Sequence, residues 1–186
     1  MNPGNNGHGG QTAEAAALID KIKNPDESVR YAAWQAAGPE GASAVAPLAD
    51  LVASDDKGVA KAAKGALDNV AHYGARPGGH SDAHAVSVAL LKLAQSSRPY
   101  AVRAQALHLL GFTADSRMAA EIGKLLEDES VREEARMCLE RIPGKASLSV
   151  LNKFAAKAPS DFRPNVAQSL HNRALMPKTV GTEPAR

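Results

Sequence analysis

The sequence is poor in several residue types, and each shortage excludes a class of protein. One of its 186 residues is cysteine, so no internal disulfide can form. Aromatic residues make up 4 % of the chain and apolar residues 44 %, which suits Ala- and Leu-rich helix packing better than a β-sandwich. No stretch reaches the roughly 18 consecutive apolar residues of a membrane-spanning helix. No membrane association is therefore predicted.

Neither sign of charge dominates the chain. It carries 22 basic and 20 acidic residues, a formal net charge of +2. A dedicated nucleic-acid binder is expected to carry a strong basic stripe, so this balance argues against nucleic acid as a partner. Residues 1–10 have no basic segment followed by an apolar run and do not form a secretory signal. The lack of a secretory signal and the single cysteine together favour a cytoplasmic location. A domain of a larger or exported protein would show the same two features.

One stretch of sequence recurs along the chain. Residues 24–38 begin Asn-Pro-Asp-Glu-Ser-Val-Arg, and residues 128–142 begin Asp-Glu-Ser-Val-Arg. Looser copies of this motif lie between these two stretches and after them. The residues at the position of the motif valine are Val29, Val59, Val102, Val131 and Phe162. The intervals between these positions are 30, 43, 29 and 31 residues. A nearly constant period in this range is typical of stacked-repeat proteins.

Each copy has the pattern of an amphipathic helix. Apolar residues follow the signature position at four and eight residues, as in Val59, Ala63 and Leu67, and this spacing places them on one helical face. The residues expected to cap these helices are Asp26, Asp55 or Asp56, Asp128, and Ser160 or Asp161. A shorter apolar pattern precedes each copy. The predicted unit is therefore an antiparallel pair, an A helix followed by a B helix, and the chain holds five units.

The motifs resemble those of the HEAT-repeat superfamily. The resemblance is carried by the Asp-x-x-Val-Arg-x-x-Ala run and by Pro-Glu-Gly-Ala-Ser-Ala-Val-Ala-Pro-Leu-Ala-Asp-Leu at 39–51, and it covers roughly 13–175. It is strongest to the short bacterial repeats also found in phycobilisome-lyase-like proteins. The third unit departs from the pattern with Arg98-Pro99, and the fifth has Pro164 within its signature. The resemblance implies an all-α, right-handed, armadillo-like superhelix (solenoid) of about five hairpins, with a role in protein scaffolding.

The chain divides into three segments. Residues 1–12 are Gly- and Asn-rich and are predicted to be disordered, residues 13–175 form the repeat domain, and residues 176–186 are expected to be a flexible tail. The longest interval exceeds the others by about 13 residues. Because Gly and Pro are dense at 74–83, the excess is placed there as an exposed loop.

The B helices are expected to line the concave surface of the solenoid. Residues two, five, six and nine positions after the signature residue point away from the core. The predicted partner-binding residues are Tyr31, Trp34, Lys61, Lys64, His108 and Arg136. Their mixed charges favour a protein partner, which the sequence does not identify. The alternative for Trp34 is packing against a neighbouring repeat or the N-terminal end of the stack.

Two further groups of polar residues allow more than one interpretation. Arg30, Arg103, Arg132 and Arg163 recur after the signature position, with Lys61 shifted by one. They form either a basic ladder for an anionic ligand or structural pairs with loop aspartates, and the resemblance favours the second. His80, Asp82 and His84, near His72, are weak metal-ligand candidates because their spacing matches no zinc motif. No metal or cofactor is therefore predicted.

No catalytic motif stands out in the sequence. It contains no Gly-rich phosphate loop and no Gly-x-Ser-x-Gly elbow, and Cys138 is expected to be a small core residue. The predicted function is a non-catalytic, protein-binding scaffold. Two alternatives stay open: a bilin lyase-like enzyme, suggested by the resemblance alone, and a HEAT-like nucleic-acid-binding protein.

Overall fold

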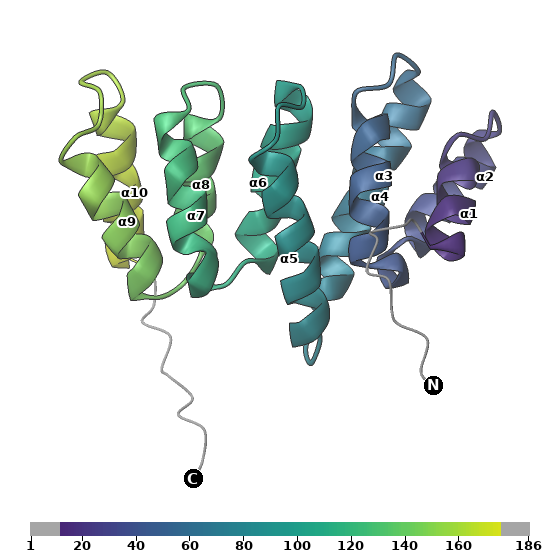
Figure 1. Ribbon diagram of the computed structural model, residues 1–186, viewed down its shortest axis with the longest axis horizontal. Coiled ribbons are helices and arrows are strands. Elements are labelled where there is room, and N and C mark those ends of the chain that lie inside the picture. Colours follow the sequence, from purple (N-terminus) through teal and green to yellow (C-terminus); the bar gives the residue numbers. More distant parts are fainter. Residues whose placement is uncertain (1–11, 176–186) are drawn as a thin grey trace, which may run out of the picture.

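The computed structural model describes residues 12–175 as a row of helical hairpins (Figure 1). These residues form ten α-helices and three short 3-10 helices and contain no strand. Hairpins that are adjacent in sequence lie side by side, and the first and last hairpins occupy opposite ends of the row. The predicted all-α solenoid of five hairpins is thus confirmed. The predictions for residues 1–11 and 176–186 lie outside the described residues.

The helices pair in chain order. The pairs are α1 (Ala13–Ile22) with α2 (Glu27–Ala36), α3 (Ala42–Val52) with α4 (Lys57–Gly74), α5 (His80–Ala94) with α6 (Tyr100–Thr113), α7 (Ala119–Lys124) with α8 (Arg132–Arg141), and α9 (Lys145–Ala155) with α10 (Arg163–Leu175). The 3-10 helix η1 (Gly38–Glu40) precedes α3, and η2 (Ser116–Met118) and η3 (Leu125–Glu127) flank α7. No helix in residues 12–175 is both long and apolar enough to cross a bilayer.

The recurring aspartates begin the B helices as predicted, with local differences. Asp26 caps α2 by accepting from the Ser28 amide at 2.8 Å. Asp56, rather than its neighbour, caps α4. Asp128 accepts from the Ser130 amide at 3.0 Å in the same way as Asp26. However, α8 begins only at Arg132, because the backbone of Val131 (φ −135°) departs from helical geometry.

The helices form two layers with the core between them. The A helices α1, α3, α5, α7 and α9 form the A layer, and the B helices α2, α4, α6, α8 and α10 form the B layer. Neighbouring B helices pack closely along the whole row, whereas α5 and α7 in the A layer do not. The A layer is therefore less closely packed between the third and fourth hairpins than elsewhere. One apolar cluster runs through all five hairpins, from Ala15 to Val166, because each hairpin covers the apolar side of the next.

Half of the predicted loop at 74–83 is helical. The helix α4 has 18 residues against 10 in α2, and α5 has 15 against 11 in α3, so the excess residues lengthen two helices. Only residues 75–79 separate α4 from α5, and they include Pro77 and Gly78 (φ +82°). Asp82 lies in the first turn of α5, where a negative charge is favourable, and pairs with Arg76 at 2.8 Å. The Gly and Pro residues thus correctly predicted a turn, but the turn is shorter than the predicted loop.

Candidate functional site

Trp34 on α2 connects the first two hairpins. Its indole lies over Gly65 of α4, since a Cβ atom on Gly65 would be 2.1 Å from Trp34 Cε2. The Trp34 carbonyl accepts from Asn69 Nδ2 at 3.0 Å, and the Tyr31 ring meets the indole edge-on at a centroid distance of 5.4 Å. Trp34 therefore packs on the neighbouring repeat, which was the alternative for this residue, but its side chain remains partly exposed.

Two hollows are both lined in part by Trp34. The larger, about 480 Å³, is lined by Trp34, Lys57, Lys61, Lys64 and parts of α4 down to Asp68. The smaller, about 270 Å³, is lined by Tyr31, Trp34, Lys61, Glu27, Arg30, Gly58 and Ala62. Lys61 and Trp34 thus belong to both. We call the surface formed by Tyr31, Trp34, Lys57, Lys61 and Lys64 the Trp34 groove. Four of these residues were predicted from the sequence.

Lys57 is the groove residue that the sequence analysis missed. It is the first residue of α4 and precedes the signature valine, whereas the prediction considered only residues after that position. The signal was nevertheless present, because spacings of four and three residues place Lys57, Lys61 and Lys64 on one side of a helix. All three side chains are exposed. Within residues 12–175, none of them forms an ion pair.

His108 lies outside the groove, in a neighbouring patch on α4, α6 and α8. We call His72, His108, Phe112 and Arg141 the Phe112 patch. The Phe112 ring is 46 % exposed and lies 5.3 Å from the His108 ring and 5.4 Å from the His72 ring. Arg141 places its guanidinium 5.4 Å from the Phe112 centroid. The spacing of His108 and Phe112, one helical turn apart, could have indicated this patch.

Asp68 connects the groove to the Phe112 patch. Its carboxylate accepts from Gln105 Nε2 of α6 at 2.8 Å. Burial raises the pKa of Asp68, and the nearby His108 and His72 oppose this effect. The half-buried carboxylate therefore borders the groove and also contributes to the contact between α4 and α6.

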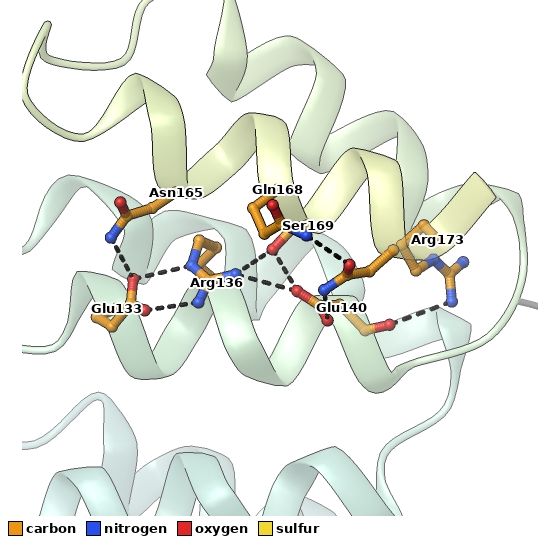
Figure 2. A network of polar contacts seen from close by, with 8 residues as sticks. Glu133, Arg136, Glu140, Asn165, Gln168, Ser169 and Arg173 are labelled. Atoms are coloured by element: carbon orange, nitrogen blue, oxygen red, sulfur yellow. Dashed lines mark hydrogen bonds and ion pairs between the residues drawn. The ribbon is translucent and has the colours of Figure 1, made fainter. Parts of the chain in front are cut away.

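Arg136 does not lie on an open surface, and its prediction as a partner-binding residue is corrected. Its side chain is enclosed between α8 and α10 (Figure 2), and the residue is only 8 % exposed. Its Nε donates to Glu133 Oε2 at 2.8 Å, and its Nη1 pairs with Glu140 Oε2 at 3.0 Å and contacts Ser169 Oγ. Hydrogen bonding from Arg136 is the main cause that lowers the pKa of Glu133. Helical periodicity pointed Arg136 away from the core, but α10 covers that side.

The same polar network holds the fifth hairpin against the fourth. Asn172 Nδ2 donates to Glu140 Oε1 at 2.8 Å. The Arg173 guanidinium donates to the carbonyls of Ile142 and Gly144, each at 2.7 Å. In α10 only Val166 and Ser169 are buried. The contact between α8 and α10 therefore combines this polar network with the apolar side chains of Val166 and Leu170.

The recurring arginines stabilise the hairpins themselves. Each donates to carbonyl oxygens at, or shortly after, the end of the A helix of its own hairpin, where helical donors are missing. The pairs are Arg30 with Asn24 (2.7 Å) and Pro25 (2.8 Å), Arg103 with Ala94 (2.9 Å), Arg132 with Leu126 (2.8 Å), and Arg163 with Ala158 (3.0 Å). Arg103 also pairs with Asp128 of the next hairpin at 2.6 Å. The arginines are thus structural, but only Arg103 forms the predicted pair with a loop aspartate, and carbonyl groups are the common partner.

The remaining candidates do not form a reactive site. His80 and His84 are exposed on α5, and Asp82 is paired with Arg76. In the described part of the chain, no three His, Cys, Asp or Glu side chains are placed to hold a metal ion. Cys138 is buried in the core as expected, and burial raises the pKa of its thiol to about 12.

Comparisons with known proteins place this architecture in a family. Residues 87–171 match the family model of HEAT repeats. Similar solved structures include two engineered proteins and a designed armadillo repeat protein. The first engineered protein is 22 % identical to this chain, and the match covers 88 % of this chain and 80 % of the engineered one, with a TM-score of 0.43. The second is 21 % identical, and the match covers 86 % of this chain and 47 % of the engineered one, with a TM-score of 0.41. The designed armadillo repeat protein is 14 % identical, and the match covers 84 % of this chain and 98 % of the designed one, with a TM-score of 0.31.

No curated protein sequence matches this chain. The assignment therefore depends on the family match and on the recurring hairpins, which continue beyond residues 87–171 on the N-terminal side. The Asp-x-x-Val-Arg motif begins the B helix in the first hairpin and precedes it in the fourth. Residues 87–171 are thus HEAT repeats, and the hairpins that precede them repeat the same architecture.

Proposed function

We propose that this protein is a non-catalytic scaffold that binds another protein through the Trp34 groove. One observation carries the proposal: Trp34, the only tryptophan, is partly exposed and lines two hollows together with Tyr31 and lysines that form no ion pair within residues 12–175. Tryptophan and tyrosine contribute most often to the binding energy of protein interfaces. An indole that is anchored on Gly65 also loses little conformational entropy when a partner covers its free edge.

The chemistry of the described residues supports a non-catalytic role. The single thiol is enclosed by the core and has a pKa of about 12, so it is protonated at neutral pH. The carboxylates of Glu133 and Glu140 are engaged by Arg136, and Asp68 is engaged by Gln105. The groove itself offers ammonium groups and aromatic rings, which suit binding more than proton transfer.

Partner capture with paired variants tests the proposal. Tyr31→Ala/Lys61→Glu changes two exposed groove residues and leaves the anchored Trp34 in place. Tyr100→Ala/Lys92→Glu makes the same two substitutions at exposed positions away from the groove. The tagged 186-residue chain is used to capture proteins from an extract of its source organism, and bound proteins are quantified by mass spectrometry.

The groove variant is expected to lose a specifically bound protein by tenfold or more, while the control variant retains it. Equal capture by both variants would place the interaction elsewhere and contradict the proposal. Circular dichroism of both variants must show unchanged helix content, so that a loss reports on the surface and not on folding.

A further inference from the structure

We infer that the Trp34 groove binds an acidic peptide segment that carries an apolar side chain next to its carboxylates. This inference rests on the proposed function and specifies the chemistry of the partner. The carboxylates would contact Lys57, Lys61 and Lys64, and the apolar side chain would enter the smaller hollow beside Tyr31 and Trp34.

The unpaired lysines give the first argument. The eight ion pairs within residues 12–175 involve Arg76, Arg98, Arg103, Arg117, Lys124, Arg136 and Lys157 as cations, so none involves the groove. Lys57, Lys61 and Lys64 lie along one side of α4, where like charges three or four residues apart repel each other. A partner with carboxylates would relieve this repulsion. The groove is therefore complementary to negative charge.

The apolar surface gives the second argument. The smaller hollow is lined by the rings of Tyr31 and Trp34 and by Ala62, and it lies directly beside Lys61. Arg30 also borders this hollow, but its Nη1 atom donates to the carbonyls of Asn24 and Pro25. The donors of this nitrogen are thus already engaged, and Arg30 adds a further positive charge beside the hollow. A bound segment would meet an aromatic wall on one side and free ammonium groups on the other.

The spacing of the lysines limits the length of the segment. Lys57 and Lys64 are seven residues apart on α4, which corresponds to about 10 Å along the helix axis. An extended peptide covers this distance with about three residues. The contact therefore requires two or three acidic residues within a short stretch, with the apolar residue next to them.

Acidic residues at the edges of the groove favour a peptide over nucleic acid. Glu27 lines the smaller hollow and Asp68 the larger one. A phosphate backbone carries a charge at every nucleotide and would be repelled by these carboxylates. A peptide can instead place apolar residues opposite them. The combination of three lysines, two carboxylates and two aromatic rings thus fits a mixed acidic and apolar segment.

Selection from a peptide library tests this inference. Random 12-residue peptides displayed on phage are selected on the immobilised 186-residue chain at 0.15 M salt. Two variants of equal net charge are then compared. Lys57→Glu/Lys61→Glu/Lys64→Glu reverses the groove lysines, and Lys92→Glu/Lys145→Glu/Lys153→Glu reverses three exposed lysines on α5 and α9 that form no ion pair within residues 12–175.

The enriched peptides are expected to carry two or more Asp or Glu residues beside a Leu, Met or Phe. Synthetic copies should bind the groove variant at least tenfold more weakly than the unmodified chain, and the control variant within twofold. Their affinity should also decrease as salt is raised, because the contact is largely ionic.

Other outcomes overturn specific parts of the argument. Neutral or basic peptides that lose binding in Tyr31→Ala would overturn the acidic segment but leave the groove as a protein-binding site. Peptides that are insensitive to every groove substitution, or no enrichment at all, would overturn both proposals. A 20-base-pair DNA duplex that binds more tightly than the peptides, and only with the groove lysines intact, would identify nucleic acid as the partner.

Discussion

The indole of Trp34 fills the space above Gly65, where a Cβ atom would lie 2.1 Å from Trp34 Cε2. This contact joins the first hairpin to the second and also orients the aromatic wall of the groove. The absence of a side chain at position 65 is therefore required for both packing and the candidate site.

Gly65→Ala is expected to destabilise the protein, although alanine is the better helix former. The added methyl group must displace a bulky ring, and overpacking of this kind costs about 1–3 kcal/mol. Because Trp34 is the only tryptophan, its fluorescence should shift to longer wavelength as the ring becomes more exposed. Urea unfolding and emission spectra check both effects. An unchanged spectrum with unchanged stability would contradict the contact.

Arg136→Met is expected to loosen the fifth hairpin. Removing a largely buried cation leaves the carboxylate of Glu140 without its ion-pair partner, which typically costs about 3–5 kcal/mol. Hydrogen exchange should accelerate in α9 and α10 before it changes in α1 to α4, because repeats depend mainly on their neighbours. Lys124→Met breaks the exposed pair with Glu121 and is the control, with an expected cost of about 0–1 kcal/mol. Equal effects of the two substitutions would contradict the role of burial.

Arg103→Lys tests the bonds between hairpins. The Arg103 guanidinium donates to the Ala94 carbonyl, the Ser130 hydroxyl and the Asp128 carboxylate at 2.9, 3.0 and 2.6 Å. A lysine cannot reproduce this planar set of donors, so a loss of about 1–3 kcal/mol is expected in urea unfolding. Arg117→Lys changes an exposed ion pair and should have little effect. If the two variants unfolded alike, the geometry of Arg103 would not matter.

Acid is expected to weaken the third and fourth hairpins through Asp128. The Ser130 hydroxyl and then Arg103 hold the pKa of Asp128 at about 2, below its usual 3.8. Because the folded-state pKa is the lower one, this stabilisation is present above about pH 4 and is lost as the pH falls toward 2. Asp128→Asn should therefore show a smaller decrease in the free energy of unfolding over this window. An identical decrease in the variant would show that Asp128 does not contribute.

Cys138 is expected to resist alkylation while the protein is folded. Its thiol is fully buried, and its pKa of about 12 leaves almost no thiolate at neutral pH. Iodoacetamide labelling followed by mass spectrometry should be slow in buffer and fast in 6 M urea. Rapid labelling of the native protein would show that α8 opens readily.

The periodicity of the sequence was sufficient to predict the hairpins. Val59, Val102 and Val131 recur because each B helix must present an apolar face to the same core, and all three are buried. The capping aspartates were equally local, as Asp26 and Asp56 show. The length of the turn after α4 was not predicted, because residues 80–83 can adopt either a loop or a first helical turn.

The candidate site was only partly predictable. The groove residues Tyr31, Trp34, Lys61 and Lys64 lie where helical geometry placed them, near one another on α2 and α4. His108 was exposed as expected but belongs to the Phe112 patch. Leu107, which the same geometry pointed outward, is fully buried.

The sequence by itself determined the number of hairpins, their order and the main apolar face of each helix, because these follow from spacing along one helix and from its caps. Only the tertiary structure decided which polar residues on the B helices remain free. Arg136 and Lys61 both point away from the core on their own helices, but α10 covers Arg136 and the neighbours of α4 leave Lys61 open. Such coverage depends on residues about one repeat away, such as Ser169, and no period within a single helix contains that information.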